Sequence, residues 1–190
     1  MKNLRALPLA LFLAVASGNA LGSSPSDVTR YEVRLPQSNR PAGGARALVY
    51  ASPELVKSVV LDFGHYATHI KPFEKSRVVG KSGDKTDVYL EVPILKGAAK
   101  IWAVLRFDPP KKVGDTEIIS ARMIKGNVEQ LHANWKLTRT PENNTELKLE
   151  FLIVPKVPVP DSLLSSEARH AAFKAVSGLK GEALKRAAGS

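Results

Sequence analysis

Between residues 87 and 153, apolar residues occupy every second position in five successive runs. Such alternation predicts β-strands with one buried face. The short turns between the runs, rich in Gly, Pro and Asn, predict an antiparallel meander. The runs cover residues 87–94, 99–107, 117–124, 131–137 and 147–153. The residues that we expect on the buried face are Leu90, Val92, Ile101, Ala103, Leu105, Ile119, Ala121, Met123, Ala133, Trp135, Leu149 and Phe151.

Shorter runs of the same kind precede this meander. Residues 30–35 alternate clearly and, with residues 45–50, predict a hairpin. Residues 76–80 predict one further strand at the start of the meander.

Two segments have the spacing of helices instead. Ser52-Pro53-Glu54 combines a Ser cap, a Pro at the first helical position and an acid in the first turn. Apolar residues follow it at helical spacing as far as Phe63, and a further short helical turn is expected over residues 65–70. Near the end of the chain, Asp161 or Ser162 is expected to cap a helix of about 25 residues. The apolar stripe of this last helix includes Leu164, Ala168, Ala172, Ala175 and Leu179.

These elements predict an α+β fold, with one domain over residues 28–187. The long C-terminal helix is expected to lie across the concave face of a curved antiparallel sheet. Its alanine side chains either let the helix approach the sheet closely or leave space between the two. The second outcome would give an internal cavity, lined by the sheet and helix residues just named.

Residues 1–22 have the three-part pattern of a secretory signal peptide. A basic start is followed by an apolar run over residues 7–16 and by the small residues Gly18 and Ala20. The apolar run is shorter than the roughly 20 residues that a membrane-spanning helix needs. We therefore predict a secreted or periplasmic protein, with residues 23–27 as a loose segment after the cleavage site.

The chain contains no cysteine, which excludes a lipoprotein anchor, disulfides and thiol chemistry. Its formal net charge is +10, to which Lys2 and Arg5 of the expected signal peptide contribute two. Export makes nucleic acid an unsuitable partner for this charge. An anionic membrane surface, touched transiently, fits it better, and a solvated basic face without a partner fits it equally well. We expect a monomer.

The sequence has no motif of a known catalytic, nucleotide or metal site. His65 and His69 have the spacing of a zinc pair on a helix, but no third ligand lies nearby, and both are expected to be exposed. Arg106, Glu91, Arg122 and Glu129 lie on the predicted sheet, mostly with outward parity, and a β-bulge would turn any one of them inward. Trp102 also has outward parity, which indicates either membrane contact or packing under a loop or the N-terminal hairpin. We assign no catalytic residue, no metal ligand and no cofactor.

Four stretches of this sequence resemble the START/Bet v 1-like superfamily, also called SRPBCC or helix-grip proteins. They are Ala51 to Phe63, Tyr66 to Val78, the run from Gly126 through Trp135 to Leu147, and Pro155 to Pro160 followed by the long helix. Within the superfamily they are similar to bacterial polyketide cyclase/dehydrase or coenzyme-Q-binding START proteins. Lys57 and Asn143-Asn144 depart from the usual residues, which are an aromatic and a Gly turn.

The resemblance implies a cavity for a hydrophobic ligand, but it does not imply one reaction. We expect a carrier or sensor of a lipid or hydrophobic molecule. One alternative is a cyclase or dehydrase acting on a polyketide-like substrate. The other is a protein-interaction module whose core is filled and binds no ligand.

Overall fold

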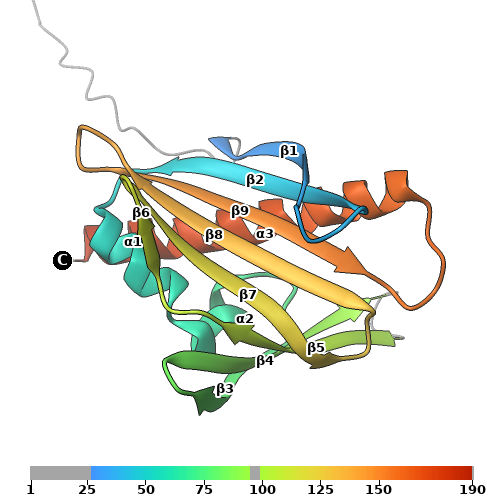
Figure 1. The fold of residues 1–190 in the computed structure, drawn as a ribbon. Coiled ribbons are helices and arrows are strands. Elements are labelled where there is room, and N and C mark those ends of the chain that lie inside the picture. The colour runs from blue at the N-terminus through green and yellow to red at the C-terminus, as the bar shows by residue number, and fades with distance from the viewer. Residues whose placement is uncertain (1–26, 95–98, 190) are drawn as a thin grey trace, which may run out of the picture.

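The computed structural model describes residues 27–94 and 99–189. Its sheet follows the order β1-β2-β9-β8-β7-β5-β4-β3, with β6 paired to β7, and every pairing is antiparallel. The long helix α3 runs along one side of this curved sheet, behind the strands in Figure 1. The predicted α+β architecture is confirmed. The elements are β1 (Thr29–Arg34), β2 (Pro41–Val49), α1 (Pro53–Val60), η2 (Phe63–His65), α2 (Tyr66–His69), β3 (Lys75–Ser82), β4 (Lys85–Ile94), β5 (Ala99–Phe107), β6 (Lys111–Val113), β7 (Thr116–Gly126), β8 (Gln130–Arg139), β9 (Thr145–Val154) and α3 (Asp161–Ala188).

The expected signal peptide and most of the loose segment after it lie outside the described residues. Among the helices that the structure describes, none combines the length and the apolar character needed to cross a membrane.

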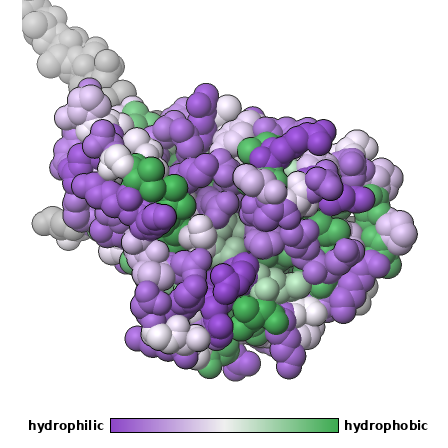
Figure 2. Space-filling model, in the orientation of Figure 1, coloured by the Kyte–Doolittle hydropathy of each residue, from purple (hydrophilic) through white to green (hydrophobic). Residues whose placement is uncertain are grey.

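The strand registers place the predicted apolar residues on one face, which we call the inner face because it is turned toward α3. Val92 of β4 lies opposite Ile101 of β5, and Leu105 of β5 lies opposite Met123 of β7. Trp135 of β8 lies between Ile119 and Leu149 of the neighbouring strands. Figure 2 shows the other face, called the outer face, on which hydrophilic side chains predominate.

Helix α1 begins as its sequence predicts. The Ser52 side chain accepts a hydrogen bond from the backbone N–H of Leu55, and Pro53 is the first helical residue.

The start of α3 differs from the prediction. Asp161 is already the first helical residue, Pro160 precedes it, and no side chain caps the helix. Asp161 still stabilises the helix start, because an acid in the first turn interacts favourably with the helix dipole.

Helix α3 approaches the sheet most closely at Gly43 of β2. A Cβ atom at this position would lie 2.1 Å from the backbone N of Arg169. The small side chains of Ala45 and Ala47, also on the inner face of β2, are buried. The alanine-rich stripe of α3 therefore allows close contact at this side of the sheet.

A second, smaller core lies on the outer face. Leu152 and Val154 of β9 have outward parity, yet both are buried together with Leu35 and Ala42. The connector from β1 to β2 covers them, since Leu35 follows directly after β1. Strand parity alone does not predict that these two residues are buried.

An ion-pair network crosses the outer face between β3, β4 and β5. The Glu91 carboxylate accepts a hydrogen bond from the Tyr89 hydroxyl at 2.5 Å and lies 3.0 and 3.1 Å from the ammonium groups of Lys100 and Lys75. The hydrogen bond from Tyr89, with those from the two lysines, lowers the pKa of Glu91 to about 2.

We expect Glu91→Gln to destabilise the protein at neutral pH. A carboxylate whose pKa is lowered by folding contributes stability above its unfolded pKa of about 4.3, and this contribution is lost as the pH falls toward about 2. In urea titrations, the gap between wild type and Glu91→Gln should shrink steadily from about pH 5 to about pH 2. Glu129→Gln, at an exposed position, is the matched control and should show no such gap. A gap for Glu91→Gln that stays constant with pH would contradict this account.

Candidate functional site

One end of the inner face is a closed core. Phe107, Ile119 and Leu147 are almost fully buried there. The buried Tyr66 hydroxyl donates a hydrogen bond to the Val60 carbonyl at 2.6 Å, and burial raises its pKa. Trp135 also hydrogen-bonds to this hydroxyl. The Tyr66 hydroxyl is thus paired on both sides, as a buried polar group requires.

Toward the other end, the inner face carries apolar residues that stay partly exposed. We call the set Val92, Ile101, Met123 and Phe151 the inner apolar surface, and all four are half-buried. The two positions directly opposite Phe151 are occupied by small residues. Ala133 lies opposite it on β8, and Gly43 lies opposite it on β2.

Small residues continue along the sheet and on the helix above it. Ala121 of β7 lies opposite Ala133 of β8, and both are buried. From α3, the buried residues Ala168, Ala172 and Ala175 contribute only methyl groups. On β7, β8 and α3, this part of the inner face therefore presents short side chains.

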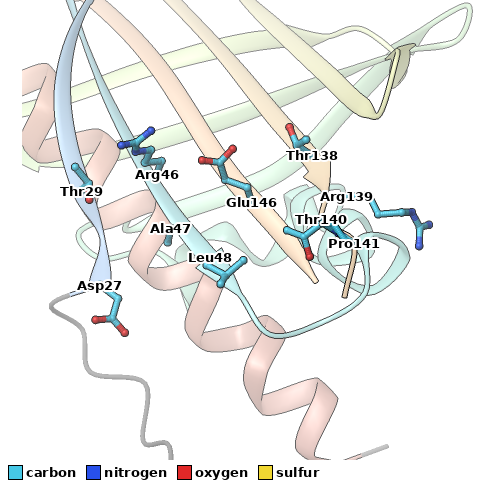
Figure 3. Close-up of a pocket in the computed structure, with 10 residues that line it drawn as sticks. All are labelled: Asp27, Thr29, Arg46, Ala47, Leu48, Thr138, Arg139, Thr140, Pro141 and Glu146. Carbon is cyan, nitrogen blue, oxygen red and sulfur yellow. The ribbon is translucent and has the colours of Figure 1, made fainter. Parts of the chain in front are cut away.

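The residues predicted to line a cavity all lie on the inner face or on α3. All except the four of the inner apolar surface are buried. The buried ones are Leu90, Ala103, Leu105, Ile119, Ala121, Ala133, Trp135, Leu149, Leu164, Ala168, Ala172, Ala175 and Leu179. Two depressions of about 440 and 380 Å³ lie on the outer face instead (Figure 3 shows the first) and do not include any of these residues.

The N-terminal half of α3 is held to the sheet edge by polar groups. Ser165 is buried and donates a hydrogen bond to the Glu32 carboxylate of β1, and the Arg169 guanidinium lies 3.1 Å from the same carboxylate. The Arg30 guanidinium lies 5.1 Å from the centre of the half-buried Phe173 ring. Sequence analysis missed these contacts, because they depend on the edge strand β1 facing the helix.

The charged residues with outward parity remain on the outer face. Arg106 holds Asp87 through two hydrogen bonds of 2.7 and 2.8 Å. The β7 register shifts opposite Val104 and Leu105, yet Arg122 still lies opposite the outward Arg106. The one irregularity between β5 and β7 therefore turns neither arginine toward the inner face.

The expectation that both histidines are exposed was correct for His65 and wrong for His69. The His69 side chain is only 9% exposed, because the C-terminal part of α3 covers it. Its ring lies 3.4 Å from the Glu182 carboxylate and 3.8 Å from that of Asp62. Arg186 joins both carboxylates at 2.7 Å, so this cluster ties α3 to the segment before α2. Within residues 27–94 and 99–189, no three His, Asp or Glu side chains are arranged to hold a metal ion.

Trp102 lies half-buried on the outer face and stacks on Tyr89 of the adjacent strand, with 6.2 Å between ring centres. The Arg77 guanidinium lies 5.2 Å from the centre of the Tyr89 ring. The indole therefore packs against a neighbouring strand, and not under the N-terminal hairpin.

The chain matches the family model described as polyketide cyclase / dehydrase and lipid transport over residues 49–180, which is more than half of its length. The chain belongs to this family. The match begins at the end of β2 and ends within α3, so it includes the inner face of β4 to β9 and most of α3. No curated protein matches the chain.

Several solved structures share the fold. The STAR-related lipid transfer protein from Xanthomonas axonopodis is similar at a TM-score of 0.70 and 13% identity, over 83% of this chain and 94% of that one. A START superfamily protein from Mycobacterium smegmatis has a TM-score of 0.66 and 17% identity, over 75% and 97%. The Zhui aromatase/cyclase from Streptomyces sp. R1128 has a TM-score of 0.60 and 19% identity, over 84% and 96%. At these identities the likeness establishes the START fold.

Proposed function

We propose that this protein binds a lipid or another hydrophobic molecule between the inner face of its sheet and α3, and acts as a carrier or sensor outside the cytoplasm. The observation that carries the proposal is the inner apolar surface. Its four residues lie inside a curved sheet, where a soluble domain normally completes its packing, yet all four remain partly exposed. Membership of a family described by lipid transport supports the same reading.

The chemistry of the surrounding positions suits an uncharged ligand. Inner-facing positions from Leu131 to Leu137 and from Leu147 to Ile153 are all apolar. The inner-facing carboxylate of Glu117 lies at the far end of the face, 3.0 Å from the ammonium group of Lys57 in α1. Burial of apolar ligand surface against such residues contributes a favourable binding free energy of roughly 25 cal/mol per Å² of buried area.

Most predicted lining residues are buried, so binding requires the half-buried side chains to move apart. Methionine is the most adaptable of them, since its unbranched chain has several low-energy rotamers. The alanines on both sides of the space limit the rearrangement to side chains.

The proposal predicts that a hydrophobic molecule co-purifies with the protein. The mature protein should be purified from its host, extracted with organic solvent and analysed by mass spectrometry. We expect one class of apolar molecule near equimolar amount, and saturable competition between it and a fluorescent fatty-acyl probe. Absence of any such molecule, together with no saturable binding of lipid probes, would contradict the proposal. It would favour the alternative of a protein-interaction module that binds no ligand. If the protein releases its ligand in chemically altered form, it would instead be an enzyme of the cyclase or dehydrase type.

Export is a separate part of the proposal. It rests on the signal-peptide pattern of residues 1–22. Fractionation and N-terminal sequencing should find a mature chain that begins close to residue 23, outside the cytoplasm. A chain that keeps its first residues in the cytoplasm would contradict export without affecting the ligand site.

A further inference from the structure

A groove on the outer face, which we call the outer groove, lies over β1, β2, β9 and β8. It encloses about 380 Å³ and is lined by Thr29, Tyr31, Arg46, Lys136, Lys148 and Glu150. These residues are on the face opposite the inner apolar surface, so the inference below does not depend on the proposed function. Thr29 and Arg46 also line the adjoining depression drawn in Figure 3.

Three cations form one row across three neighbouring strands of this groove. Arg46 of β2 lies directly opposite Lys148 of β9, and Lys148 lies directly opposite Lys136 of β8. Directly opposed side chains have Cβ atoms about 5 Å apart, and like charges in such pairs are destabilising. A row of three cations therefore works against stability unless anions compensate for it.

The protein compensates for two of these cations. Lys136 donates a hydrogen bond to Glu150 at 2.6 Å, and the Lys148 ammonium lies 2.7 Å from the Glu146 carboxylate. Arg46 is exposed and has no carboxylate within 4 Å anywhere in residues 27–94 and 99–189. Figure 3 shows its guanidinium on the side of β2 toward β1, apart from Glu146 on β9.

Neutral hydroxyl donors complete the groove. The Tyr31 ring lies flat over Gly44, where a Cβ atom would come within 2.4 Å of the ring. Burial and the nearby Glu150 raise the pKa of Tyr31 to about 12, so its hydroxyl keeps its proton. This hydroxyl makes no hydrogen bond with the described part of the chain, and Thr29 lies beside it on the same strand face.

We propose that the outer groove binds a phosphate group, with Arg46 as its principal ligand and the Tyr31 hydroxyl as a second donor. Glu150 and Glu146 compensate for two of the three cations, so the positive charge of Arg46 is left for an anion. A guanidinium pairs with two phosphate oxygens at once. The remaining oxygens of a tetrahedral phosphate accept hydrogen bonds from the hydroxyl and from Lys148.

Inorganic phosphate is the probe for the test, followed by amide chemical shifts at low ionic strength, where surface charges are least screened. We expect saturable shifts confined to β1, β2, β8 and β9. Arg46→Gln should weaken binding at least tenfold, and Tyr31→Phe, which keeps the ring over Gly44, should weaken it severalfold. Glu150→Gln should tighten binding, because it frees Lys136 and removes the carboxylate from the groove.

Arg122→Gln is the matched control, since Arg122 is an exposed arginine of the same outer face on β7. It removes the same charge outside the groove and should change phosphate affinity less than twofold. Non-saturable shifts, equal losses in Arg46→Gln and Arg122→Gln, or weaker binding in Glu150→Gln would each overturn the proposal.

Vesicles distinguish the two sources of the phosphate. Binding to vesicles with phosphatidic acid, but not to phosphatidylcholine vesicles, and its loss in Arg46→Gln would identify a lipid headgroup. Binding of inorganic phosphate without vesicle binding would identify a free phosphate compound. Both results support the phosphate site.

Discussion

Replacing Gly178 by alanine is expected to lower the free energy of unfolding by about 2 to 3 kcal/mol, although alanine is the better helix former. Gly178 lies in α3 where the helix crosses the end of α2. A Cβ atom there would be 2.2 Å from the carbonyl oxygen of His69 and 3.1 Å from the Cα of Ile70. Both are backbone atoms, so the clash can be relieved only if α3 moves away from α2.

Gly181 provides the matched control in the same helix. It lies three residues further along, is exposed, and has no atom within 4 Å of an added Cβ. Gly181→Ala should therefore stabilise the protein by about 0.5 to 1 kcal/mol through helix propensity alone. Urea unfolding of the two variants measures both effects. Equal changes in the two variants would show that α3 does not pack on α2 as described.

Ile101→Glu is expected to weaken hydrophobic ligand binding by about ten- to a hundredfold, since an unpaired carboxylate in an apolar site costs about 1 to 3 kcal/mol or more. Ile101 is half-buried on the inner face and lies opposite Val92. The effect should be read from the affinity for a fluorescent fatty-acyl probe. This prediction rests on the proposed function.

Val104→Glu tests whether the loss is specific to the inner face. Val104 is also half-buried on β5, but it lies on the outer face opposite Tyr89. Its replacement should leave the probe affinity within about twofold, provided that thermal unfolding shows both variants to be folded. Unchanged binding in Ile101→Glu, or equal losses in both variants, would place the ligand elsewhere.

The alternation of apolar residues predicted the meander because each of its strands has one face in the core and one in water. This rule failed where both faces are covered, as at Leu152 and Val154. It also placed the start of β2 too late, because Gly43 and Gly44 have no side chains with which to show a pattern. Both positions require glycine because α3 packs directly on Gly43 and the Tyr31 ring packs directly on Gly44.

Local sequence patterns also gave a wrong prediction for the exposure of one polar residue. His69 follows one helical turn after His65, which suggested a shared exposed face, but α3 closes over His69 from more than a hundred residues away. The backbone conformation of Asn143, in contrast, is one that its residue type favours. It adopts a φ of 58° in the turn between β8 and β9, a conformation that Asn tolerates better than other non-Gly residues.

Periodicity and caps, which are local properties, predicted the order of the helices and of all strands except the short β6, together with the residues of the inner face. The family was indicated separately, by the resemblance of four sequence stretches. Tertiary structure decided which of those residues stay partly exposed, since this depends on where α3 crosses the sheet. It also decided the outer groove. Arg46, Lys136 and Lys148 are separated by up to a hundred residues, and only the strand registers bring their three charges into one row.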